Sequence, residues 1–261
     1  MEKLRLFDSH CHLDDQKLYG DLEDVLQRAA EAGVERITNI GCDWPSSLMS
    51  VRLAERYPGR IYAAVGVHPH DADSLDAKML ERLKELAQLP QVVAWGEIGL
   101  DYHYDNSPRD VQREAFALQI EAAKELKKPI IIHDREAHQD TLDIIKKHNG
   151  GVNGGIFHCF SGSAEMAREC VKLGFMVAFG GAVTFKNAVH PLEAAAAVPL
   201  DMLLIETDAP YMTPVPFRGK TNEPARMCYT AEKLAEIKGI SVEELADITY
   251  RNACKVFNIA L

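Results

Sequence analysis

Six side chains that can bind a metal ion stand at or just beyond the ends of apolar segments in this 261-residue sequence. They are His10, His12, Glu97, His133, His158 and Asp208. An imidazole or carboxylate buried in an apolar strand costs several kcal/mol unless it is paired or ligated. A single such histidine is usually a satisfied structural residue. Five apolar segments that each deliver such a group predict a shared metal site instead.

The number and type of these groups predict two divalent ions. Four histidines and two carboxylates exceed the needs of one tetrahedral catalytic metal with an open position. The first ion is expected to be bound by His10, His12, Glu97 and Asp208. The second is expected to be bound by Glu97, His133 and His158. Glu97 would bridge the two, and nitrogen and oxygen ligands without thiolate are compatible with Zn, Mn, Mg, Co, Ni or Fe.

The segments that carry these groups alternate between strand-like and helical patterns along the whole chain. Apolar runs typical of buried parallel strands cover 4–8, 36–40, 61–67, 92–97, 129–133, 155–158, 175–179 and 202–206. Amphipathic segments cover 22–32, 46–57, 77–89, 108–126, 139–148, 164–173, 188–197, 225–237 and 242–257. This alternation predicts an α/β fold, a single-domain (β/α)8 TIM barrel over residues 1–261. The candidate ligands then gather at the carboxyl ends of the strands, where barrel enzymes hold their active sites.

Composition narrows the class of protein. Lys and Arg number 29 against 39 Asp and Glu, which gives a net charge of −10 and argues against a broad nucleic-acid-binding surface. We find no apolar run of about 18 residues, so no membrane span is expected. The six cysteines are scattered without a C-x-x-C pair, which predicts reduced thiols and a cytoplasmic location. No obligatory protein partner is expected.

Several motifs together resemble the TatD family of metal-dependent hydrolases, which belongs to the amidohydrolase barrels. They are His10-Cys-His12-Leu-Asp14, Gly66-Val-His68-Pro69, Gly96-Glu97-Ile-Gly-Leu-Asp101-Tyr102, His158-Cys-Phe-Ser161-Gly162, Glu206-Thr-Asp208-Ala-Pro-Tyr211 and Arg218-Gly-Lys220-Thr-Asn222-Glu223-Pro224. The resemblance implies a TIM barrel with two divalent metals. It also implies a deoxyribonuclease, mainly a 3′→5′ exonuclease on single-stranded DNA. Some family members lack the first H-x-H, which is present here, so a complete metal-binding set is expected.

The chemistry expected of such a site is attack on a phosphodiester by a metal-bridging hydroxide. Asp208 is the expected general base, and His68 is expected to bind phosphate or to protonate the leaving oxygen. Glu206, two residues before Asp208, either hydrogen-bonds a metal ligand or pairs with a Lys or Arg. Three cations are candidates for phosphate binding: Arg135, Arg218 and Lys220.

Two other functions stay open at the level of sequence. The same two ions can hydrolyse a small amide, ester or lactone, as in other amidohydrolase barrels, and the fold alone does not decide between substrates. Against this reading, Glu97 holds the place on the fourth strand where a carbamylated bridging lysine would stand. The second rival is a non-catalytic scaffold, whose sign would be a lost ligand, and all six are present. Single-stranded DNA or another phosphodiester is the expected partner.

Overall fold

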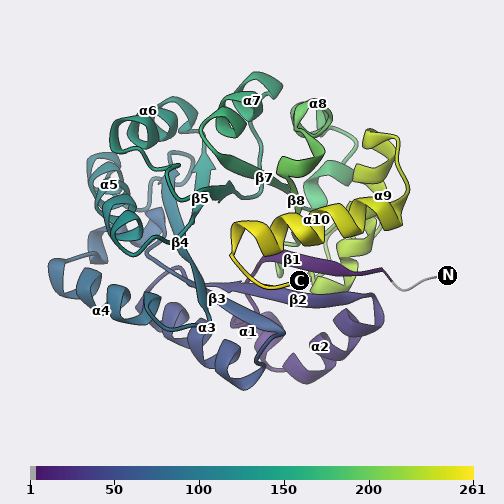
Figure 1. Cartoon of the computed structure of the whole chain (residues 1–261), viewed down its shortest axis with the longest axis horizontal. Helices are drawn as coiled ribbons and strands as arrows, with labels where there is room; N and C mark the ends of the chain where they lie inside the picture. Colours follow the sequence, from purple (N-terminus) through teal and green to yellow (C-terminus); the bar gives the residue numbers. More distant parts are fainter. Residues whose placement is uncertain (1–3) are drawn as a thin grey trace.

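The computed structural model describes residues 4–261 as an eight-stranded parallel barrel ringed by helices (Figure 1). The strands are β1 (Leu6–Cys11), β2 (Val34–Ile40), β3 (Ile61–Val65), β4 (Val92–Asp101), β5 (Ile130–Arg135), β6 (Gly155–Phe157), β7 (Phe175–Phe179) and β8 (Leu203–Ile205). They pair in chain order from β1 to β8, and a parallel bridge between Cys11 and Ala209 joins the last segment to the first. The expected TIM-barrel fold is confirmed.

The helices lie mainly around the outside of the barrel and carry the chain from one strand to the next (Figure 1). The α-helices are α1 (Gln16–Tyr19), α2 (Leu22–Glu31), α3 (Trp44–Arg56), α4 (Ala77–Ala87), α5 (Arg109–Glu125), α6 (His138–His148), α7 (Ala164–Lys172), α8 (Val189–Ala197), α9 (Met227–Lys238) and α10 (Val242–Val256). The 3₁₀ helices are η1 (Pro69–Ser74), η2 (Gly181–Thr184), η3 (Leu200–Met202) and η4 (Pro224–Arg226). The amphipathic pattern predicted α2 to α10, but it predicted neither α1 nor the 3₁₀ helices. Within residues 4–261, none of the helices has the length and apolar character needed to cross a membrane.

Two apolar groups hold the barrel together. The larger one packs the outer faces of the strands against the helices. The smaller one includes residues from all eight strands, such as Phe7 and Ile131, together with Tyr250 and Phe257 near the end of the chain. Because α10 crosses the barrel in Figure 1, its side chains fill the end of the barrel where the strands begin. This end is therefore occupied by apolar packing.

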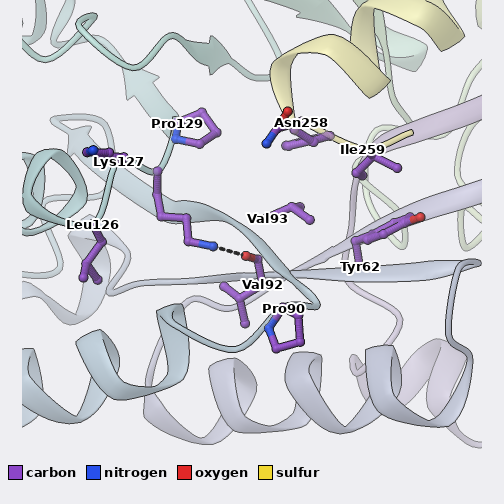
Figure 2. A pocket seen from close by; sticks show the side chains of 11 residues that line it. Tyr62, Pro90, Val92, Val93, Leu126, Lys127, Pro129, Asn258 and Ile259 are labelled. Carbon is purple, nitrogen blue, oxygen red and sulfur yellow. Dashed lines mark hydrogen bonds between the residues drawn. The ribbon is translucent and has the colours of Figure 1, made fainter. Parts of the chain in front are cut away.

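A cavity of about 320 Å³ lies beside this packed end, between the starts of the strands and the chain's last residues (Figure 2). Asn258 and Ile259 stand on one side of it and Pro129 on another, and Lys128 donates a hydrogen bond to the carbonyl of Val92 at 2.5 Å. Among the described residues that line this cavity there is no imidazole and no carboxylate. Metal-binding chemistry is therefore concentrated at the opposite end of the barrel.

Hydrogen bonds between side chains and backbone close the barrel between β1 and the segment after β8. Asp8 accepts bonds from the Thr207 hydroxyl at 2.5 Å and the Thr207 amide at 2.9 Å. The Ser9 hydroxyl donates to the Ile205 carbonyl at 3.0 Å. Burial raises the pKa of the Asp8 carboxyl to about 7, although the bonds from Thr207 act in the other direction. These hydrogen bonds form a seam between β1 and the segment after β8. The seam fixes the position of β1 along the barrel axis relative to the segment that carries Asp208.

Two register shifts lie beside residues that the sequence marks as ligands. One shift lies between Asp8 and Cys11 in β1, and the other lies within 95–98 of β4. Bulges of this kind re-aim side chains next to active sites. Both strands also continue beyond the apolar runs that predicted them, so His10 and Glu97 lie within strands.

Gly99 lets β4 and β5 approach closely beside the same region. Its φ is +143°, and a Cβ at this position would lie 2.0 Å from the His133 carbonyl oxygen. Because that oxygen belongs to the backbone of β5, a rotamer change cannot relieve the contact. The spacing of Glu97 and His133 therefore depends on glycine at position 99.

We expect Gly99→Ala to lower the free energy of unfolding by about 3 kcal/mol, because it combines a backbone clash with a strained φ. The measurement is urea unfolding followed by far-UV circular dichroism. Gly20→Ala is the matched control, since Gly20 has a φ of −61° and no atom within 4 Å of a built Cβ. Equal stability of the two variants would contradict the close approach.

Candidate metal centre

A pocket of about 690 Å³ opens at the carboxyl ends of the strands and brings the predicted ligands together. Its walls include His12, Glu97, His133, His158 and Asp208. His10 is fully buried, with its Nε2 3.3 Å from Glu97 Oε2. The six side chains come from β1, β4, β5 and the segments that follow β1, β6 and β8. Residues far apart in the chain are thus adjacent at one end of the barrel.

The first group of donor atoms surrounds Glu97 Oε2. His10 Nε2 lies 3.3 Å from that oxygen, and His12 Nε2 lies 3.9 Å from it. Asp208 Oδ1 lies 3.8 Å from His10 Nε2 and 3.5 Å from His12 Nε2. The two imidazole nitrogens are themselves 3.2 Å apart. These four side chains are the set that the sequence predicts for the first ion.

The second group of donor atoms surrounds the other oxygen of the same carboxylate. His133 Nδ1 and His158 Nε2 each lie 2.7 Å from Glu97 Oε1, and they are 3.4 Å from each other. His68 Nε2 lies 3.5 Å from the same oxygen. The structure thus brings His68 beside the three side chains predicted for the second ion.

The spacings within the first group fit metal coordination. Ligand atoms at about 2.0–2.2 Å from a tetrahedral ion lie about 3.3–3.6 Å from one another. The donor atoms of the first group are separated by 3.2–3.9 Å, which spans that range. The donors are imidazole nitrogens and carboxylate oxygens, which suit divalent cations such as zinc or manganese.

The charges in the site complement one another. Burial opposes ionisation of Glu97, but the imidazoles of His158, His68 and His10 outweigh it and hold the pKa of the carboxyl well below its ordinary range. Burial likewise opposes ionisation of Asp208, and contact with His12 and the other imidazoles lowers its pKa. Both carboxylates are therefore anionic, as metal ligands must be.

Comparison with known proteins places the chain in a family. The sequence profile described as "TatD related DNase" matches residues 7–258. The chain belongs to the TatD family of metal-dependent hydrolases. The "uncharacterized metal-dependent hydrolase YabD" of Bacillus subtilis is 50% identical over 254 residues, which cover 97% of this chain and 99% of that protein. The resemblance carried by the sequence motifs is thereby confirmed.

Two further TatD-family relatives come from Escherichia coli. The "uncharacterized metal-dependent hydrolase YcfH" of strain K12 is 42% identical over 258 residues, covering 97% of this chain and 96% of YcfH. The crystal structure of YJJV, a TatD homolog, has a TM-score of 0.92 and 34% identity, covering 98% of this chain and 99% of that chain. The family and the fold therefore extend over nearly the whole chain.

Beneath the pocket of this TatD-family protein, three buried polar atoms face one another. They are His10 Nδ1, His158 Nδ1 and Glu206 Oε2, and none of them has a hydrogen-bond partner. The two imidazoles stack with ring centroids 3.8 Å apart, and Glu206 Oε1 lies 3.7 Å from His158 Nδ1. The same oxygen accepts a hydrogen bond from the Cys159 amide at 2.5 Å. No Lys or Arg in the described part of the chain forms an ion pair with Glu206, and the titratable side chain beside it is His158.

The backbone is strained at two positions next to the ligands. Asp208 has a φ of +53°, and Cys159, directly after His158, has a φ of +42°. Non-glycine residues in this region cost about 1–3 kcal/mol and cluster at active sites. The Asp208 amide donates to the His10 carbonyl at 2.9 Å, which holds the strained segment against β1.

His68 and Arg135 both reach the pocket of the TatD-family site. His68 Nδ1 accepts a hydrogen bond from the His70 amide at 3.1 Å, so the neutral imidazole carries its proton on Nε2. Burial, together with the neighbouring His133, lowers the pKa of His68 to about 4. The guanidinium of Arg135 lies 4.7 Å from the ring centroid of Tyr104.

Arg218 and Lys220 are not brought to the pocket. The Arg218 guanidinium packs 3.7 Å from the ring centroid of Phe185, and Lys220 Nζ lies 5.7 Å from that of Phe217. Neither is among the described residues that line the pocket. Their part in substrate binding stays a prediction.

Sequence reasoning missed a carboxylate that supports the second group. Asp101 Oδ2 lies 3.1 Å from His133 Nε2 and 2.9 Å from His70 Nε2. Metal-binding imidazoles commonly donate their second N–H to such a carboxylate. The sequence contains a signal for this role. Asp101 lies four residues after Glu97, so the two side chains share one side of β4 if the strand continues to residue 101. His70, the other partner of this carboxylate, lies in η1 and not directly after a predicted strand, so the sequence pattern gives no signal for it.

We expect Glu206→Gln to weaken zinc binding by about 10–100-fold, because a carboxylate behind two ligand imidazoles orients them and raises their basicity. The measurement is competition with a chromophoric chelator at fixed pH. Glu243→Gln on the surface is the control. If both variants bind zinc like the wild type, Glu206 has no influence on the ligands.

Proposed function

We propose that this TatD-family protein is a two-metal deoxyribonuclease that releases nucleotides from the 3′ end of single-stranded DNA. One observation carries the proposal: the two oxygens of Glu97 face two separate groups of donor atoms. A bridging carboxylate between two ions is suited to in-line displacement at phosphorus. The family description, TatD related DNase, supports DNA as the substrate.

The dimensions of the pocket favour a single strand over a duplex. Its volume of about 690 Å³ is that of a small-molecule site, enough for a nucleotide at the end of a strand. A double helix does not fit into such a space without unpairing. The acidic total charge of −10 adds no long-range attraction for a duplex surface.

The chain's own residues supply distinct parts of the reaction. When bound, two divalent cations would polarise the phosphodiester and activate a water molecule. Asp208, whose side chain is 13% exposed, borders the pocket and accepts the proton from the attacking water. His68 donates its Nε2 proton as a hydrogen bond to a phosphate oxygen, and Arg135 adds positive charge at the pocket wall.

We expect Asp208→Asn to lower kcat for single-stranded DNA by about 10²–10⁴-fold, because it removes the proton acceptor and one metal ligand. Glu97→Gln should abolish cleavage, since it removes the carboxylate shared by both groups. The measurement is stepwise shortening of a 5′-labelled oligonucleotide with added manganese or zinc, and with EDTA as the metal-free reference.

Glu243→Gln on the surface again serves as the control and should cleave like the wild type. Metal content measured on the same samples separates loss of metal from loss of chemistry. Undiminished cleavage in both site variants would refute these roles. If the wild-type protein does not cleave DNA but hydrolyses a lactone, an amide or a carboxylic ester, the site carries out the alternative hydrolytic reaction.

A further inference from the structure

We propose that Tyr104 and Tyr211 are stacking positions for the two bases that flank the scissile phosphodiester. This inference rests on the proposed nuclease function. Both tyrosines line the metal-binding pocket, and both are exposed, Tyr104 by 55% and Tyr211 by 48%. Exposed aromatic rings beside a site for a single strand are the usual platforms for bases, because every base has a face that can stack.

Tyr104 stands on the wall formed by the loop after β4. Its ring meets the edges of His70 and His103 at centroid distances of 5.5 and 4.8 Å. The guanidinium of Arg135 lies 4.7 Å from the same ring centroid, and Arg135 also lines the pocket. These neighbours hold the ring in place, and the guanidinium lies over the ring, which stays 55% exposed. This wall therefore offers both an exposed stacking surface and a phosphate partner.

Tyr211 stands on the wall formed by the segment after β8. Its amide donates to the Asp208 carbonyl at 2.8 Å, which ties the ring's position to a metal ligand. Its hydroxyl donates to Asp15 Oδ2 at 3.1 Å, and its ring centroid lies 6.2 Å from that of His12. The ring is therefore fixed beside the first group of donor atoms while about half of it faces solvent.

The position of Arg135 beside Tyr104 gives the substrate a direction. Arg135 is the only Lys or Arg among the described residues that line the pocket. Asp14 and Asp15 line the pocket on the side of Tyr211, where Lys17 Nζ lies 5.4 Å from the centroid of the tyrosine ring. Asp43 and Asp71 also line the pocket, so Arg135 is the one position among its described lining residues where a Lys or Arg meets the substrate. The part of the DNA strand on the 5′ side of the scissile bond carries further phosphates, so we expect it to leave the pocket past the cation Arg135. The terminal nucleoside, which has no further phosphate, lies against Tyr211.

The test combines leucine variants with oligonucleotides that lack one base. Tyr104→Leu and Tyr211→Leu should each raise KM for a single-stranded decamer by about tenfold, with kcat changed less. Tyr104→Phe and Tyr211→Phe should keep a near-wild-type KM, because the ring remains. Tyr19→Leu is the control, since Tyr19 is 41% exposed and lies outside the residues that line the pocket.

Abasic substrates assign each ring to its base through double-mutant cycles. Removal of the terminal base should cancel the KM effect of Tyr211→Leu, and removal of the penultimate base should cancel that of Tyr104→Leu. Unchanged KM in the leucine variants, or equal effects on intact and abasic strands, would overturn the stacking proposal. If removal of the terminal base cancels the effect of Tyr104→Leu instead, the proposed direction of the DNA strand across the pocket is wrong.

Cleavage by the wild-type protein separates failure of the stacking proposal from failure of the proposed nuclease function. If the wild-type protein loaded with metal cleaves no oligonucleotide, the nuclease proposal fails and the stacking proposal fails with it. If the wild type cleaves and the leucine variants keep its KM, the nuclease proposal stands and only the stacking proposal is refuted.

Discussion

The burial of one carboxylate is the constraint on which the rest of this structure depends. Glu97 is 3% exposed, and an isolated anion at such a position would be driven to take up a proton. It remains an anion because imidazoles from several segments surround both of its oxygens. Each of those imidazoles belongs to a different part of the barrel, so the charge balance holds only if the strands keep their relative heights. The seam between Asp8 and Thr207 and the close approach at Gly99 are the local devices that fix those heights.

The fold and the meeting of the six candidate ligands at one end of the barrel could be predicted from the sequence because both depend on regular features. A strand buried on both faces is a continuous apolar run, so a polar group directly after such a run marks its end. In a parallel barrel all of those ends lie on one side, and linear positions such as His133 and His158 translate directly into neighbours in space. His68 likewise directly follows the apolar run 61–67, and its expected role in phosphate binding or proton transfer rests largely on the family resemblance.

The remaining parts of the site follow from features that periodicity does not record. The register shift between Asp8 and Cys11 changes which side chains of β1 face inward, and no residue type in that segment announces it. Strand β4 continues to Asp101, so this carboxylate lies at the site even though it follows the apolar run. The walls that carry Tyr104 and Tyr211 are loops, and their course depends on tertiary contacts such as the hydrogen bond from Tyr211 to Asp15.

A protein with a net charge of −10 can still act on a polyanion, because the field that matters is local. Charges separated by more than about 8–10 Å in physiological salt are largely screened, so acidic groups on the outer helices have little effect inside the pocket. Within it, two divalent cations would outweigh the anionic charge of Glu97 and Asp208. The low dielectric around the buried ligands strengthens that attraction for a phosphate that enters. The proposed preference for a strand end over a duplex follows from the same division: attraction acts only on a phosphate already inside the pocket, and the net charge of −10 adds no long-range attraction for a helix.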